Sequence, residues 1–130
     1  MAFKEFKNFR KVVDYLGSWP SFHDAQVLNV ELDAKIPTII MRVYAFETDK
    51  TLDEKGHYKR IKNCIITLKF FSIQDLELYD FNYQNVLFNL EFKIIKKKIK
   101  VLINSSYGLN GKFVCEKAEI ISVESCKAYC

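Results

Sequence analysis

The stretch that decides how this chain folds is WPSFHDAQV, at residues 19–27. It holds the only tryptophan of the chain, one of its two prolines and one of its two histidines. A helical pattern of apolar residues stops just before this stretch, and an alternating strand pattern begins within it. Such a concentration of unusual side chains indicates either an ordered corner between helix and sheet or a functional site. We call this part of the chain the signature corner; its residues are Trp19, Pro20, Ser21, Phe22, His23 and Asp24.

Before the corner, apolar side chains recur at steps of three and four residues, with charged residues filling much of the opposite side. The recurring positions are Phe3, Phe6, Phe9, Val13 and Leu16. This spacing predicts an amphipathic helix over residues 3–16, packed through its aromatic stripe. Gly17 stands at the position where a helix commonly ends.

After the corner, apolar and polar residues alternate, which predicts half-buried strands. The predicted strands cover residues 26–33, 38–46, 60–71, 86–94, 99–103 and 112–123, with a brief further alternation at 75–80. Residues 47–58 are polar, which predicts a long exposed hairpin loop. A shift of phase at Lys117 and Ala118 indicates a bulge in the last strand.

The connections between these strands are too short for parallel crossovers, so the pairing should be antiparallel. The predicted fold class is α+β: an N-terminal helix, then a strongly twisted antiparallel sheet of about six or seven strands in mainly meander order. Residues 1–130 should form a single domain, with the helix at about 3–16, the sheet at about 26–123 and a short C-terminal tail.

Composition places the chain among globular proteins. Hydrophobic residues make up 49% and aromatic residues 15% of its 130 residues, well outside the disordered class. No apolar run of 18 residues exists to span a membrane, and the charged N-terminus lacks a signal core. These features predict a cytoplasmic protein, or one exported without a cleaved signal.

The charge of the chain comes almost entirely from lysine. The formal net charge is +4, with seventeen lysines and only three arginines. Recognition of phosphates and base edges favours the planar arginine fork, so nucleic acid is an unfavoured partner. Lysines crowd residues 93–100, where protection of a strand edge is the preferred interpretation over a patch for phosphate or an acidic partner.

The four cysteines show neither a C-x-x-C motif nor zinc-ligand spacing. Cys64 and Cys115 lie inside strand-like runs and should behave as small core hydrophobes. Cys126 and Cys130 stand near the chain end, where their redox state stays open. A metal site drawing on His23, Asp24, His57 and Asp80 is disfavoured because these residues are scattered, so the sequence predicts neither metal nor cofactor.

The pair His23 and Asp24 admits three interpretations. Asp24 could orient His23 as a general base, but no nucleophile motif accompanies the pair. The pair could belong to a surface for a protein partner. We favour an architectural role, in which Ser21 or Asp24 accepts backbone N–H bonds in the turn while Trp19 and Phe22 fill the core. The polar-aromatic residues 81–85 likewise read mainly as a turn.

Three segments together resemble one bacterial family. The first is WPSFHDA at residues 19–25, followed by Gln26. The second is DLEL at residues 75–78 running into FNYQNV at 81–86. The third is SYG at residues 106–108, followed by Phe113 and Cys115. Over about residues 17–121 the chain is similar to the immunity protein 50 family, small single-domain proteins associated with polymorphic toxin systems.

The resemblance implies a binding protein without catalytic activity, which neutralises a cognate toxin by occlusion. The candidate partner-binding positions are His23, Asp24, Asn82, Gln84 and Tyr107. We expect a monomer or homodimer, and the lack of an apolar run predicts no membrane partner. Because inhibitors of basic nucleases tend to be acidic, the net charge of +4 predicts a toxin that is acidic or not a nuclease. The alternative is a small-ligand binder that uses the concave face of the sheet.

Overall fold

The computed structural model describes residues 2–52 and 54–127. Within these residues the chain forms a short 3-10 helix, η1 (Ala2–Glu5), one α-helix, α1 (Arg10–Leu16), and eight strands. The strands are β1 (Gln26–Asp33), β2 (Thr38–Leu52), β3 (Tyr58–Phe71), β4 (Gln74–Tyr79), β5 (Val86–Ile95), β6 (Lys98–Tyr107), β7 (Asn110–Cys115) and β8 (Lys117–Ser125).

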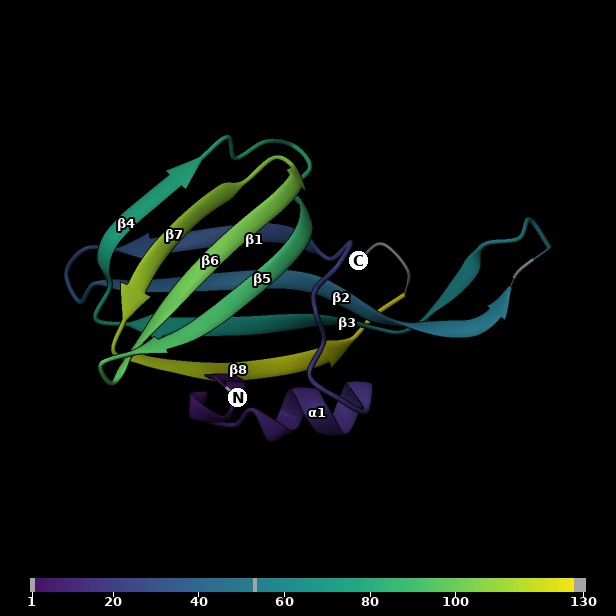
Figure 1. Ribbon diagram of the computed structural model, residues 1–130, viewed down its shortest axis with the longest axis horizontal. Coiled ribbons are helices and arrows are strands. Elements are labelled where there is room, and N and C mark those ends of the chain that lie inside the picture. Colours follow the sequence, from purple (N-terminus) through teal and green to yellow (C-terminus); the bar gives the residue numbers. More distant parts are fainter. Residues whose placement is uncertain (1, 53, 128–130) are drawn as a thin grey trace.

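All the strands belong to one antiparallel sheet in the order β4-β7-β6-β5-β1-β2-β3-β8. Figure 1 shows that the sheet folds over itself, so that β4, β7, β6 and β5 lie across β1, β2, β3 and β8. The two halves meet at a narrow seam, where β1 pairs with β5 only at Gln26 and Val86. At a second corner, Glu116 alone separates β7 from β8.

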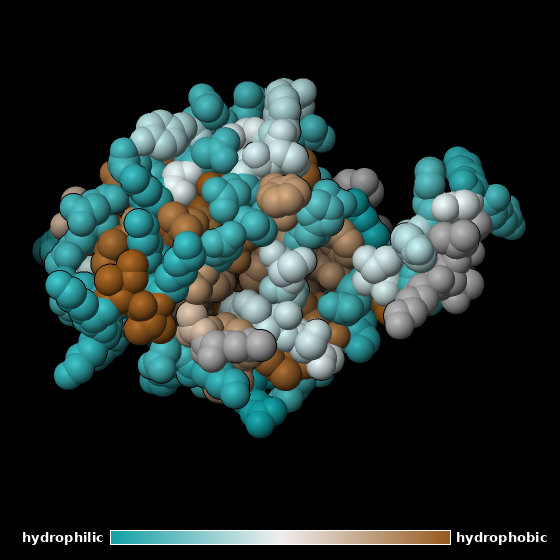
Figure 2. Space-filling model, viewed as in Figure 1, coloured by the Kyte–Doolittle hydropathy of each residue, from teal (hydrophilic) through white to brown (hydrophobic). Residues whose placement is uncertain are grey.

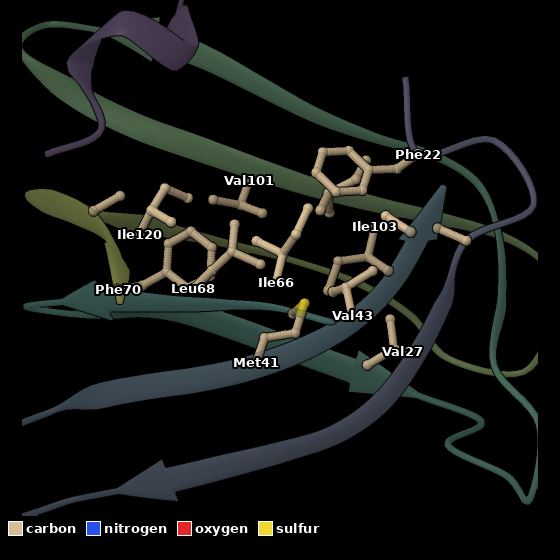
Figure 3. Packing of buried hydrophobic residues seen from close by; sticks show 14 of the residues in the cluster. Phe22, Val27, Met41, Val43, Ile66, Leu68, Phe70, Val101, Ile103 and Ile120 are labelled. Atoms are coloured by element: carbon tan, nitrogen blue, oxygen red, sulfur yellow. The ribbon is translucent and has the colours of Figure 1, made fainter. Parts of the chain in front are cut away.

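The hydrophobic core lies between the two halves. Side chains from β6, such as Val101 and Ile103, face Val43 of β2 and Ile66 of β3 (Figure 3). Each of these four side chains is at most 1% exposed. Removing this apolar surface from water is the main force that holds the halves together, and it leaves the concave face of the sheet filled.

The predicted fold class is wrong in its helical part. The structure is a mostly antiparallel sheet with one short α-helix, not a helix-plus-sheet fold. The number of strands is eight rather than six or seven. Meander order holds only within β1-β2-β3 and β5-β6-β7, because β4 and β8 reach the two outer positions through long-range pairing.

The predicted helix over residues 3–16 is interrupted because the chain at Lys7 pairs with strand β8. The backbone N–H of Lys7 donates to the carbonyl of Ala118 at 2.9 Å, and the N–H of Ile120 donates to the carbonyl of Lys7 at 2.9 Å. Asn8 then adopts a left-handed conformation with φ 65°. Only after this break does α1 begin, and it ends as predicted at Gly17, whose φ is 92°.

The polar segment 47–58 is also not the predicted loop. Strands β2 and β3 continue through most of it, with Glu47 opposite Ile61 and Thr48 opposite Arg60. Figure 1 shows the resulting hairpin projecting from the body of the molecule. The guanidinium of Arg60 lies 4.1 Å from the centre of the Phe46 ring, which stabilises the base of this arm.

Cys64 and Cys115 are free thiols in the core, as predicted, and both are fully buried. Cys130 lies outside the described residues. Burial raises the pKa of the Cys64 thiol to about 11 and that of the Cys115 thiol to about 12. Both residues therefore act as small apolar side chains at neutral pH.

We expect these two thiols to resist alkylation in the native protein at about pH 8 and to label only after unfolding. Since their folded pKa values exceed that of a free thiol, about 8.5, the unfolded chain loses these protons first as the pH rises. The stability that this contributes is present below about pH 8.5 and falls as the pH approaches 11. Mass spectrometry of the labelled peptides and urea midpoints at increasing pH would check both points; rapid native labelling at Cys64 would contradict them.

Candidate functional site

The signature corner is fixed by backbone hydrogen bonds to strand β5. The N–H of Asp24 donates to the carbonyl of Leu87 at 2.9 Å, and the N–H of Leu87 donates to the carbonyl of Ala25 at 2.8 Å. Phe22 and Asp24 both adopt left-handed backbone conformations, with φ 64°. Such conformations are costly for a bulky residue like Phe22, so the surrounding contacts must hold the corner in place.

Aromatic packing supplies much of that hold. Trp19 stacks on Phe3 with ring centres 4.9 Å apart and meets the edges or faces of Phe6, Phe22 and Phe92 within 6.1 Å. Phe22 is 2% exposed, as we predicted, whereas Trp19 is only half-buried and packs against the outside of the core. The corner thus joins the N-terminal segment to the sheet.

His23 and Asp24 point outward beside this packing. The Nδ1 atom of His23 lies 3.1 Å from the carbonyl oxygen of Phe88, and its Nε2 atom lies 3.7 Å from a carboxylate oxygen of Asp24. The hydroxyl of Ser21 accepts the backbone N–H of His23 at 3.2 Å. Both side chains of the pair remain more than half exposed, so solvent weakens their mutual attraction.

A hollow of about 290 Å³ lies between residues 20–25 of the corner and residues 45–48 of β2. His23 and Asp24 both line it, together with Thr48. It is at the small end of the range for ligand sites. The Ser21 hydroxyl, the nearest nucleophile in sequence, is already bonded to the backbone of His23.

Asn85 lies at the centre of the next segment and is 3% exposed. Its Oδ1 atom accepts the N–H of Asn82 at 3.0 Å and the N–H of Leu109 at 2.9 Å, while its Nδ2 atom donates to the carbonyl of Asn82 at 2.9 Å. Its own carbonyl accepts the N–H of Val27 at 2.9 Å. The side-chain amide of Asn85 therefore ties residues 81–85 to the loop at Leu109, and its backbone carbonyl ties them to strand β1.

The third segment, residues 106–108, packs directly against the second segment at Gly108. A Cβ atom at this position would lie 2.3 Å from the carbonyl oxygen of Gln84 and 2.6 Å from Oδ1 of Asn85. Gly108 also has φ 89°, which favours glycine. Nearby, the hydroxyl of Ser106 donates to the carbonyl of Val86 at 3.2 Å.

The three segments that carry the family resemblance therefore meet at one end of the folded sheet. We call this meeting point the junction; it comprises residues 19–27, 81–88 and 105–110. The junction lies at the seam between the two halves of the sheet. Sequence reasoning identified each segment but not their contact, because residues about 20 to 60 positions apart pair only once the sheet has folded.

Exposed aromatic side chains surround the junction. Tyr83 is 82% exposed, and its ring centre lies 6.0 Å from that of Tyr107, which is 45% exposed. A hydrogen bond with Tyr83 raises the pKa of Tyr107. Phe81 and Phe88 are each 57% exposed. The rings of Phe88 and His23 form a T-shaped contact with their centres 5.5 Å apart.

Five residues were predicted to contact a partner: His23, Asp24, Asn82, Gln84 and Tyr107. The structure brings all five to the junction, although Asn82 uses its Oδ1 atom to accept the backbone N–H of Tyr83 at 2.8 Å. Sequence reasoning missed Phe81, Tyr83 and Phe88. Phe81 and Tyr83 lie in a polar turn, where alternation gives no reason to bury them. Phe88 lies in strand β5, where alternation with Leu90 and Phe92 predicts an inward side chain; that prediction is wrong, since Phe88 is exposed.

A larger hollow lies elsewhere. It measures about 830 Å³ and lies where residues of η1, the β5–β6 hairpin and the β7–β8 corner come together. Its charged lining is balanced, with three lysines and three glutamates: Lys7, Lys97, Lys117, Glu5, Glu116 and Glu119. The concave face predicted for a small ligand is instead occupied by the core.

The described residues show no cluster of three or more histidine, cysteine or carboxylate side chains that could hold a metal ion. The residues considered for a metal site, His23, Asp24, His57 and Asp80, are not brought together into such a cluster. Within residues 2–52 and 54–127, no helix has the length and apolar character to cross a membrane.

Comparison with known proteins identifies the family of this chain. The family model described as Immunity protein 50 matches residues 8–126, which include all three segments. Neither the curated proteins nor the solved structures contain a match to the chain. Because the family model covers nearly the whole sequence, the chain belongs to the immunity protein 50 family.

Proposed function

We propose that this protein neutralises a cognate protein toxin by binding it, without chemistry of its own, through the aromatic surface at the junction. Membership of an immunity protein family supports the binding role. The observation that carries the choice of surface is the meeting of the three family segments beneath Phe81, Tyr83, Phe88 and Tyr107, four aromatic side chains that are 45–82% exposed.

Exposed tyrosine and phenylalanine residues are suited to this task. Aromatic side chains supply large apolar contact areas, and tyrosine is enriched among residues that dominate binding energy. At the junction they stand on a frame held by Asn85 and by the backbone bonds of the corner. A frame that is already ordered reduces the entropy lost on binding.

The catalytic interpretation of His23 and Asp24 gains no support from the geometry. The separation of 3.7 Å is long for a hydrogen bond, and both groups are open to solvent. Placed beside Phe88, the pair instead fits the polar rim of a protein interface. A complex should bury roughly 1,200–2,000 Å² in total.

We expect the double variant Tyr83→Ala with Tyr107→Ala to weaken binding of the toxin about a hundredfold, a loss typical of two central aromatic residues. The first measurement is co-expression with the product of the neighbouring gene, scoring growth and co-purification. Calorimetry of the purified pair then gives the affinities. The urea midpoint of the variant should stay close to that of the parent, because both side chains are exposed.

Tyr58→Ala is the matched comparison, since Tyr58 is 60% exposed but lies on the projecting arm. Its affinity should stay within about threefold of the parent. If Tyr58→Ala disrupts the complex and the junction variant does not, the contact surface is the arm. If a toxic neighbour remains toxic in the presence of the folded protein, the immunity function itself is wrong.

A further inference from the structure

The hairpin between β5 and β6 concentrates positive charge far from the junction. Residues 93–100 read KIIKKKIK, so that five of the eight residues are lysine. These five charges exceed the net charge of +4 for the whole chain, so the remainder of the protein has a net charge of −1. We call these residues the lysine hairpin; its lysines are Lys93, Lys96, Lys97, Lys98 and Lys100.

The turn of the lysine hairpin departs from the local rules for stability. Lys96 and Lys97 connect the strands as a two-residue turn with φ values of 49° and 67°. Turns with two left-handed residues strongly favour Asn-Gly, because lysine has a Cβ atom that disfavours this conformation. The two lysines at the tip therefore make the turn less stable than Asn-Gly would, a local cost of the kind found at functional sites.

The strands beside the turn also hold lysines in a destabilising arrangement. Lys93 lies directly opposite Lys100 in the register of β5 and β6, and like charges in opposed positions are destabilising. The compensation is slight: Lys93 lies 3.9 Å from a carboxylate oxygen of Glu91, and Lys98 donates to the side-chain oxygen of Gln74 at 3.1 Å.

Protection of a sheet edge does not account for these lysines. Strand β6 lies between β5 and β7 and is paired on both sides. Lys98 and Lys100 belong to β6, so they shield no free edge. Edge protection, the interpretation favoured from the sequence, fits only Lys93. This residue lies on β5, which pairs with β1 only at Val86.

Two exposed isoleucines accompany the charge. Ile94 is 46% and Ile95 is 47% exposed, whereas Ile99 is buried in the core. Figure 2 shows hydrophobic and hydrophilic residues interleaved on the face that carries β5, β6 and β7. The lysine hairpin contains neither arginine nor an aromatic residue, which argues against a nucleic-acid site and against a protein hot spot.

Although the sequence predicts no membrane partner, we propose that the lysine hairpin binds the surface of an anionic membrane. Clusters of four to eight basic residues are attracted to anionic lipid headgroups, and partly exposed apolar side chains beside them can enter the boundary between headgroups and acyl chains. Lys97 itself lines the hollow behind the tip, and the other charged residues there, Lys7 and Lys117 against Glu5, Glu116 and Glu119, sum to −1. The hairpin and the hollow together therefore keep an excess of four positive charges.

Membrane binding at this site leaves the junction free. The junction lies at the Val86 end of β5 and the lysine hairpin at the Ile95 end, nine residues apart, or roughly 30 Å along an extended strand. The protein could therefore hold a partner at one end while the other contacts lipid. This inference does not depend on what the junction binds.

The test is co-sedimentation of the full chain with vesicles of phosphatidylcholine alone or with 30% phosphatidylglycerol, at low and high salt. The parent should bind the anionic vesicles at least tenfold more tightly, and salt should abolish the difference. The double variant Lys96→Asn with Lys97→Gly should bind roughly thirtyfold more weakly, because two surface charges are lost. Its thermal midpoint should rise, because the turn then has its favoured residues.

Lys35→Gln with Lys59→Gln is the control, since it removes the same charge from exposed positions outside the hairpin. It should bind the anionic vesicles within about threefold of the parent. An equal loss in both variants would show that net charge alone attracts the protein. Equal affinity for neutral and anionic vesicles, or binding to a short DNA duplex without binding to anionic vesicles, would overturn the proposal.

Discussion

Replacing Asn85 with alanine is expected to lower the free energy of unfolding by about 3–5 kcal/mol. The substitution leaves the buried backbone N–H of Leu109 and the part-buried N–H of Asn82 without their acceptor. It also removes the donor to the carbonyl of Asn82. Each buried polar group left unsatisfied costs about 1–3 kcal/mol, and the amide is too deeply enclosed for water to replace it freely.

Urea denaturation followed by circular dichroism would measure this effect. Asn104→Ala is the matched control, because Asn104 is exposed and its Nδ2 atom bonds only the side chain of Asn89, at 2.7 Å. The control should lose less than about 1 kcal/mol. A loss for Asn85→Ala as small as that of the control would mean that Asn85 does not hold the junction together.

Comparing the Asn85 variant with the tyrosine variants separates the effect of stability from that of direct contact. Removing the amide should loosen residues 81–85 and the loop at Leu109 together, since both are bonded to it. Toxin binding should then weaken through disorder of the surface. Changes at Tyr83 and Tyr107 act on contact alone and leave the frame intact, so the two kinds of variant weaken binding for different physical reasons.

Alternation in the sequence identified the paired strands because a half-buried strand must alternate to bury one face. Strands β1, β3 and β5 begin within about two residues of their predicted positions. The predicted helix failed because tertiary pairing of Lys7 with β8 overrides a local helical pattern. Nothing within residues 3–16 reveals that partner, which lies more than a hundred residues later.

The last strands show the same limit. The phase shift near Lys117 was visible in the sequence, but its interpretation as a bulge was wrong. At Glu116 the chain leaves one half of the sheet and enters the other, as the N–H of Glu116 donates to the carbonyl of Phe71 at 3.0 Å. A bulge and a corner produce the same change of phase, so only the pairing of strands distinguishes them.

The net charge of the chain does not show where its lysines lie. The sequence suggested that a chain of net charge +4 would suit an acidic toxin or one that is not a nuclease. In the structure five lysines gather in the β5–β6 hairpin, at the far end of β5 from the junction. Since the attraction between charges falls with distance and salt, this hairpin contributes little to the field at the junction. For a toxin that binds at the proposed surface, the charges near the junction matter more than the net charge of the chain, and an acidic or non-nuclease toxin stays a prediction.

Trp19→Ala is expected to lower the free energy of unfolding by about 3 kcal/mol and to release the N-terminal segment from the sheet. The indole contacts Phe3 and Phe6 of that segment on one side and Phe22 and Phe92 on the other. Truncating a large packed aromatic residue typically costs 3–5 kcal/mol, and the partial exposure of Trp19 places it at the lower end of that range.

Release of the N-terminal segment in Trp19→Ala can be measured by amide hydrogen exchange. Lys7, whose backbone bonds to strand β8 hold the segment, directly follows Phe6, whose ring packs against Trp19. Amide hydrogen exchange at Lys7 and Ile120 should therefore accelerate in Trp19→Ala more than exchange in β2 and β6. Phe88→Ala is the control, because Phe88 is 57% exposed and its ring contacts His23; it should cost less than about 1 kcal/mol. An unchanged urea midpoint for Trp19→Ala would mean that the corner does not anchor the N-terminus.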